Sequence, residues 1–100
     1  MAPWTVEFSP RARNDLQRLY EVLLEHDREA ARDALRKVSR GVEMLKVFPR
    51  SCRWAAGTRG RNLRELIIPF GNAGYVLLFR LQPPSRVQVI GVRHQREDDC

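Results

Sequence analysis

The strongest structural signal in the chain is the stretch LRELIIPFGNAGYVLLFRL, which spans residues 63–81. It begins with a run of β-forming residues that stops at Pro69, passes through turn-forming residues at 70–74, and continues into alternating apolar positions. A second turn at residues 83–85 leads into another alternating segment. Three strands joined by short turns predict an antiparallel meander. The expected strands are residues 63–68, 75–81 and 87–92.

The first half of the chain predicts a short strand at residues 4–8 and two helices. Ser9 is a good N-cap with Pro10 at the first helical position, and the apolar stripe that follows ends near His26. Asp27 can cap a second helix, which Pro49 would end. We expect the buried face of this second helix to carry the apolar residues at helical spacing, namely Ala31, Leu35, Val38, Val42, Leu45 and Phe48.

The resulting element order is β-α-α-β-β-β, in an α+β domain. The short joint between the helices predicts a helical hairpin, packed on one face of a small antiparallel sheet. Small residues on the second helix, including Gly41, would allow close packing. The other face of the sheet is left without a helix. With 100 residues, the chain is predicted to be a single domain over residues 1–100.

Charge is distributed unevenly along the chain. Residues 1–50 hold ten Lys/Arg and eight Asp/Glu, a net of +2, whereas residues 51–96 hold eight Arg and one acid, Glu65, a net of +7. Residues 97–99 contribute a net charge of −3, which gives the total of +6 for the chain. Residues 50–62 have no period and are interpreted as a basic loop. Such a surface favours nucleic acid, acidic proteins or anionic membranes, and arginine favours bidentate contacts with phosphate or carboxylate.

Several classes of protein are disfavoured. No apolar run approaches the roughly 20 residues that cross a bilayer, and no secretory signal is visible at the N-terminus. The two cysteines, Cys52 and Cys100, form neither a disulfide framework nor a zinc motif. We therefore expect a cytoplasmic protein that needs no cofactor or metal and makes no membrane contact.

Three segments, residues 6–16, 63–80 and 87–97, resemble the RelE/ParE toxin family in order and spacing. The resemblance spans residues 4–97 and implies the same fold. It implies the toxin of a bacterial type II toxin–antitoxin pair, which forms a hetero-oligomer with a neutralising antitoxin. ParE-like members inhibit DNA gyrase and block replication, whereas RelE-like members cleave mRNA on the ribosome. The family alone leaves both targets open.

RNA cleavage would need cations for the phosphorane and an acid or base for proton transfer. If the chain is RelE-like, the catalytic candidates are Arg64, Arg80 and His94. RelE-like toxins often carry lysines in the basic segment and a tyrosine near the C-terminus. Here the only lysines are Lys37 and Lys46, and residues 97–100 hold no aromatic residue. These departures favour the ParE branch, for which no catalytic residue is expected.

The candidate target-binding residues are six of the eight arginines of the basic half together with one tryptophan: Arg59, Arg61, Arg64, Arg80, Arg93, Arg96 and Trp54. Each also has a structural interpretation. Trp54 could cover the edge of the core, Arg64 could extend from the sheet to solvent along its aliphatic stem, and His94 could be an ordinary strand-end residue. A basic toxin suits an antitoxin with an acidic segment that folds on binding. The groove of the helical hairpin and the edge of the sheet are the two candidate docking places.

Overall fold

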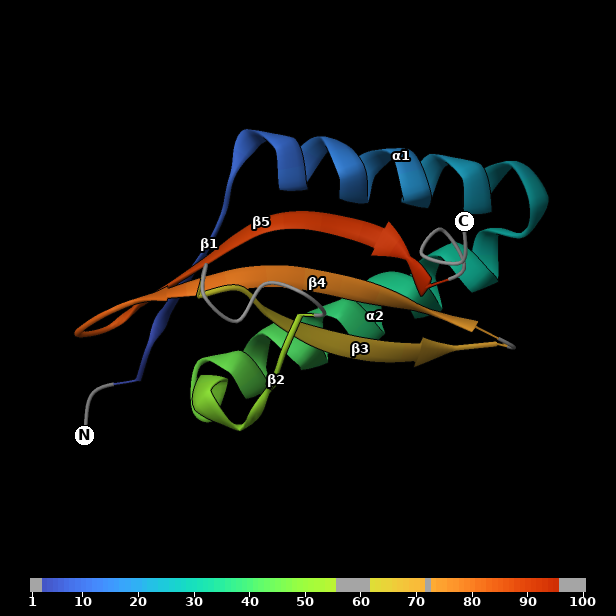
Figure 1. Ribbon diagram of the computed structural model, residues 1–100. Coiled ribbons are helices and arrows are strands. Elements are labelled where there is room, and N and C mark those ends of the chain that lie inside the picture. The colour runs from blue at the N-terminus through green and yellow to red at the C-terminus, as the bar shows by residue number, and fades with distance from the viewer. Residues whose placement is uncertain (1–2, 56–61, 72, 96–100) are drawn as a thin grey trace.

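The computed structural model describes residues 3–55, 62–71 and 73–95. Figure 1 shows two helices lying along one side of a twisted sheet. The element order confirms the predicted β-α-α-β-β-β succession, with a 3-10 turn and a two-residue strand added before the meander. The elements are β1 (Thr5–Phe8), α1 (Pro10–His26), α2 (Arg28–Leu45), η1 (Pro49–Ser51), β2 (Arg53–Trp54), β3 (Arg64–Phe70), β4 (Ala73–Gln82) and β5 (Arg86–His94).

The sheet has the strand order β1-β5-β4-β3-β2. The predicted antiparallel meander is confirmed for β3, β4 and β5. The prediction of a wholly antiparallel sheet is wrong for the first strand, because β1 runs parallel to β5, from Thr5 opposite Arg86 to Phe8 opposite Val89. The alternation that identifies a strand carries no information about the direction of its neighbour. The sheet is therefore mixed.

Both helices begin where their caps predict. The Ser9 side chain accepts a hydrogen bond from the Ala12 backbone N–H at 3.1 Å, and Pro10 opens α1. Asp27 closes α1 and caps α2, where its Oδ1 accepts hydrogen bonds from the N–H groups of residues 29 and 30 at 2.9 and 3.2 Å. These bonds satisfy donors that have no partner within the helix.

The core lies between the helices and one face of the sheet. Phe79 and Leu77 of β4 are fully buried there. A Cβ added at Gly41 would lie 3.1 Å from side-chain carbons of both Leu66 and Ile68, so the absence of a side chain lets α2 approach β3 closely. This contact accounts for a glycine in the middle of a helix, where it costs about 1 kcal/mol relative to alanine.

Two residues assigned to the buried face of the second helix lie elsewhere. The helix ends at Leu45, before Pro49, and Phe48 adopts a non-helical backbone with φ −128° and ψ 51°. Helical spacing therefore no longer directs its side chain, which is 63% exposed. Leu35, 37% exposed, lines a groove instead of the closed core.

A β-bulge in β5 links the sheet to α1. Leu78 lies opposite Gly91 and Phe79 opposite Val89, which leaves one extra residue in β5. Asp15 of α1 accepts a hydrogen bond from the Val92 N–H at 3.2 Å. Bulges redirect the residues that follow them, and the residue after Val92 is one of the predicted target-binding arginines.

Candidate target-binding surface

The second face of the sheet, which turns away from α1 and α2 and is here called the outer face, carries charged side chains. Directly paired residues share a face, so Glu65, Arg80 and Arg93 lie on the face opposite to that of Leu77 and Phe79. Arg80 is exposed and makes no side-chain ion pair or hydrogen bond with the described residues. Its guanidinium is therefore available for an external phosphate or carboxylate.

Glu65 organises the arginines on this face. Its carboxylate is buried, at 7% exposure, and contacts Arg53 Nε at 2.6 Å and Arg93 Nη2 at 3.4 Å. The Arg53 side chain is 65% exposed and that of Arg93 is 23% exposed. One acid held between two arginines leaves a net positive charge. The pair also limits the rotamers of both guanidinium groups, so less ordering is needed when they bind an anion.

Arg64 and Trp54 lie on the side of the sheet that faces the helices. They sit directly opposite one another on β3 and β2, and the Arg64 guanidinium lies 4.1 Å from the centre of the Trp54 ring. Arg64 also donates hydrogen bonds to the carbonyl oxygens of Arg50 and Cys52, at 3.2 and 2.8 Å. These contacts tie β3 to η1, so Arg64 is engaged in holding the chain segment before β2.

The neighbouring Cys52 side chain is buried. Burial raises the pKa of the Cys52 thiol above its ordinary value of 9.0, and the positive charge of Arg64 opposes this change less strongly. The thiol is therefore neutral at physiological pH and behaves as a small apolar side chain of the core.

The three candidates for RNA cleavage do not converge. Arg64 and Arg80 lie on opposite faces of the sheet. His94 lies opposite Tyr75, whose ring it contacts edge-on at 5.8 Å between centroids. Tyr75 is five residues from Arg80 along β4, which corresponds to about 17 Å in a strand. No common position is within hydrogen-bonding distance of all three side chains. Of the remaining predicted residues, Arg59, Arg61 and Arg96 lie outside the described residues.

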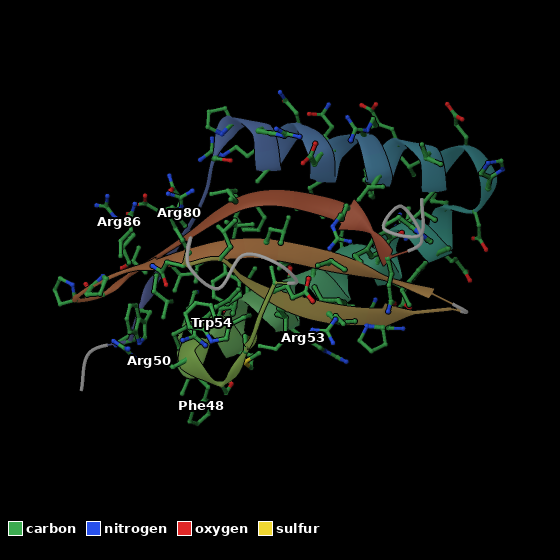
Figure 2. The ribbon with its side chains drawn as sticks, viewed as in Figure 1. Phe48, Arg50, Arg53, Trp54, Arg80 and Arg86 are labelled. Carbon is green, nitrogen blue, oxygen red and sulfur yellow. The ribbon has the colours of Figure 1, made fainter. Side chains whose placement is uncertain are left out.

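Three further arginines were not indicated by the sequence pattern: Arg50 and Arg86 lie at the same end of the molecule as Arg80, whereas Arg53 lies nearer its middle (Figure 2). The Arg50 guanidinium lies 5.4 Å from the centre of the Trp4 ring. Arg53 forms an ion pair with Glu65, and Arg86 Nε lies 3.7 Å from Glu7 Oε2. A two-residue strand is too short to show alternation, so β2 was hidden in an apparently aperiodic basic loop.

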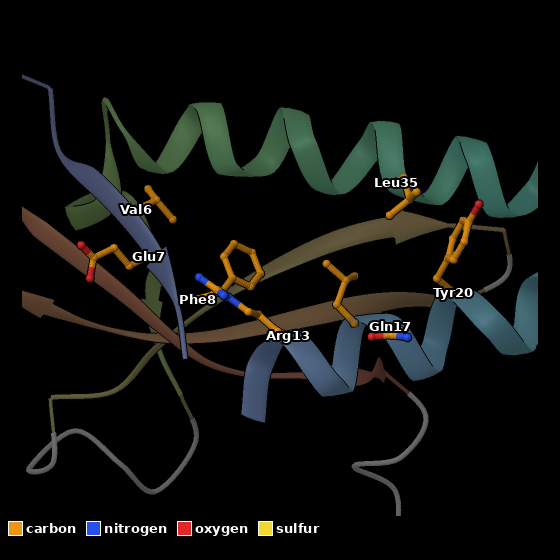
Figure 3. Close-up of a pocket in the computed structure, with 8 residues that line it drawn as sticks. Val6, Glu7, Phe8, Arg13, Gln17, Tyr20 and Leu35 are labelled. Atoms are coloured by element: carbon orange, nitrogen blue, oxygen red, sulfur yellow. The ribbon is translucent and has the colours of Figure 1, made fainter. Parts of the chain in front are cut away.

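A groove lies between β1 and the two helices (Figure 3). It has a volume of about 660 Å³, and its lining combines apolar side chains with an arginine and a glutamate. The apolar members come from all three elements, so the groove exists only once the hairpin has packed on the sheet. The lining residues are Val6, Glu7, Phe8, Arg13, Leu16, Gln17, Tyr20 and Leu35.

The described residues hold no group of three or more His, Cys, Asp or Glu side chains that could bind a metal ion. In the same part of the chain, no helix is long and apolar enough to cross a membrane.

Comparison with known proteins identifies the class, which is the toxins of type II toxin–antitoxin systems. The family profile described as "ParE toxin of type II toxin-antitoxin system, parDE" matches residues 6–99, and the chain belongs to this family. It is 36% identical over 93 residues to Toxin RelE3 of Caulobacter vibrioides, a match that covers 93% of this chain and 96% of the relative.

The fold has a close counterpart among solved structures. A chain of the "Chromosomal ParDE TA system from P. aeruginosa" superposes with a TM-score of 0.71 at 15% identity, covering 91% of this chain and 95% of the other. At that level of identity the likeness concerns the fold. It agrees with the two helices and mixed sheet described above.

Proposed function

We propose that this toxin is a ParE-like inhibitor of DNA gyrase that acts in the cytoplasm, blocks replication and performs no chemistry on its target. The observation that carries the proposal is the separation of Arg64, Arg80 and His94: Arg64 and Arg80 lie on opposite faces of the sheet, and His94 lies opposite Tyr75, five residues along β4 from Arg80. General acid–base catalysis requires its groups within hydrogen-bonding distance of the reacting atoms. An arginine-rich surface without such convergence suits binding to an acidic protein surface or to DNA held by that protein.

The outer face supplies the proposed contact. Arg80 presents a guanidinium with no side-chain partner among the described residues, and on the same face the Glu65 carboxylate contacts Arg53 and Arg93. Arginine binds carboxylates and phosphates through two parallel hydrogen bonds. We assign Arg53, Arg80 and Arg93 as target contacts. Arg64, occupied by Trp54 and two carbonyl groups, supports the surface from the other side.

The proposed docking place for the antitoxin is the groove between β1 and the helices. Its apolar walls suit the apolar face of a helix that folds on binding, and Arg13 at its rim suits an acidic residue of that helix. The experiment compares Leu35→Glu with Leu24→Glu, because both leucines are partly exposed, at 37% and 39%, and only Leu35 lines the groove. Affinity for the cognate antitoxin should fall only for Leu35→Glu. Equal affinities would exclude the groove.

The gyrase proposal is tested by titrating the purified toxin into gyrase, relaxed plasmid and ATP, and resolving topoisomers and linear DNA on a gel. Lost supercoiling or accumulated cleaved plasmid at near-stoichiometric toxin is the expected result, and His94→Ala should behave as the wild type. Unchanged supercoiling by folded toxin would overturn the proposal. Ribosome-dependent mRNA cleavage that disappears in His94→Ala would instead establish a RelE-like nuclease.

A further inference from the structure

The turn after α2 displays two large apolar side chains to solvent. Val47 is 58% exposed and Phe48 is 63% exposed, the highest values among the large hydrophobic residues in the described part of the chain. Single exposed apolar residues are ordinary on protein surfaces. Here two consecutive residues, one of them aromatic, are exposed, and this pair is called the Val47–Phe48 knob.

The knob is held in place by the fold. The fully buried side chains of Leu45 and Pro49 anchor the chain on either side of it. The Phe48 N–H donates to the Met44 carbonyl at 2.8 Å. The Phe48 carbonyl accepts from the Ser51 N–H at 3.2 Å and from its hydroxyl at 2.7 Å. Since the backbone is already fixed, binding through Phe48 would cost little additional ordering.

The knob adjoins the basic end of the molecule. The Trp4 N–H donates to the Lys46 carbonyl at 2.8 Å, which places β1 beside the knob, and the Arg50 guanidinium lies over the Trp4 ring. The next residue, Thr5, pairs with Arg86 of β5. Figure 2 shows Phe48 and Arg50 at the same end as Arg80 and Arg86. Arg50 makes no ion pair with the described residues, so its charge can attract an acidic partner.

We propose that the Val47–Phe48 knob docks into an apolar pocket with an acidic rim on the protein that this toxin inhibits. The inference deepens the proposed function, and it rests on that function only in requiring a protein target. Aromatic residues, including phenylalanine, and arginine are both enriched in protein interfaces. The aliphatic Val47 has no face on which a base could stack, which favours protein over nucleic acid. The proposed antitoxin groove has its own apolar lining, to which neither Val47 nor Phe48 belongs.

The test compares Phe48→Ser and Val47→Ser with Val22→Ser. Val22 is the matched control because it is 49% exposed and lies on α1. All three variants should keep the wild-type melting temperature and antitoxin affinity, since each side chain is exposed. For Phe48→Ser, the concentration that half-inhibits gyrase supercoiling should rise about tenfold or more, as for a dominant interface residue. Val47→Ser should show a smaller rise, and Val22→Ser none.

Growth arrest after induction in cells separates this inference from the gyrase proposal. The wild type could arrest growth without inhibiting gyrase, with the arrest relieved only by Phe48→Ser and Val47→Ser. That result would support docking of the knob on a target protein and would overturn the gyrase proposal. If Phe48→Ser inhibits gyrase and arrests growth as the wild type does, docking falls and the gyrase proposal stands. Loss of antitoxin affinity in Phe48→Ser would also overturn docking on the target. A wild type that neither inhibits gyrase nor arrests growth would overturn both.

A photoreactive benzoyl-phenylalanine at position 48 tests the chemical class of the partner directly. Incubated with purified gyrase and plasmid and then irradiated, it should cross-link to a gyrase subunit, while the same residue at position 22 should not. Cross-linking to DNA in place of protein would overturn the inference.

Discussion

The two faces of the sheet are formed by the same three strands, but one face is apolar and buried and the other carries charged side chains. The face under the helices buries Leu77, Phe79 and Val89 almost completely. The outer face carries arginines around one buried carboxylate, that of Glu65. Burial of apolar area on the first face stabilises the fold. On the second face, the buried Glu65 carboxylate loses its hydration, which costs free energy that its contacts with arginine offset. Stability and target binding should therefore respond to different substitutions, even at adjacent positions of one strand.

The largest effect is expected under the helices. Phe79→Ala removes a fully buried ring and leaves a cavity, so the free energy of unfolding should fall by about 3–5 kcal/mol. Its neighbour on the outer face, Leu78, is only partly buried, and Leu78→Ala should cost clearly less. Urea denaturation followed by circular dichroism measures both. Equal losses would contradict the division between the faces.

The buried carboxylate should give the next largest effect. Glu65→Gln removes the negative charge between Arg53 and Arg93 while keeping the shape of the side chain, and should cost about 1–3 kcal/mol. The loss is smaller than for a fully buried pair because Arg53 reaches solvent. Adding Arg53→Ala to Glu65→Gln should cost little more, since the two substitutions remove the same interaction. Additive losses in denaturant titrations would show that Glu65 stabilises the fold independently of Arg53.

Substitution of Arg80 should weaken target binding with little effect on the free energy of unfolding. Arg80→Ala removes an exposed guanidinium, so the free energy of unfolding should change by less than about 0.5 kcal/mol. Inhibition of gyrase should weaken by about tenfold if Arg80 binds a carboxylate or phosphate. Arg36→Ala is the control, because Arg36 is exposed on α2, away from the outer face. A potency for Arg80→Ala that matches Arg36→Ala would remove Arg80 from the target contacts.

The smallest effect concerns alkaline pH. Burial raises the pKa of Cys52 above 9.0, so the unfolded thiol loses its proton at lower pH than the folded one. The stability contributed by the neutral thiol is complete below pH 9 and is lost as the pH rises toward the folded pKa. Tyr75 adds to the same trend, since burial raises its pKa above 10.0. Cys52→Ala should flatten the fall in melting temperature above about pH 9; an unchanged slope would assign the fall to Tyr75 and other groups.

Local signals predicted the elements well. Ser9 and Asp27 cap the helices where their side chains can reach backbone N–H groups two or three residues later. The alternation in residues 75–81 and 87–92 identified β4 and β5. The small Gly41 was expected to let the two helices approach each other closely, and it instead lets α2 approach β3. The family resemblance read from the sequence is confirmed by the family profile over residues 6–99.

The sequence pattern was less informative about how distant segments combine. It did not show that β1 runs parallel to β5, that Phe48 leaves the helix and enters solvent, or that Arg53 and Arg93 share Glu65. Nor did it show that Arg64, Arg80 and His94 lie apart. Each of these facts depends on pairings between residues far apart in the chain.

The difference between the features that the sequence predicts and those that it does not has a physical cause. Caps, turns and periodicity are interactions within a few residues, so the amino-acid sequence alone determined the helices, the meander and the basic character of the second half. Which face a side chain occupies, and which charges meet there, follows from strand register and from the bulge in β5. Those features arise only when helices and strands pack together to bury apolar area. The tertiary structure therefore decided which arginines share one surface.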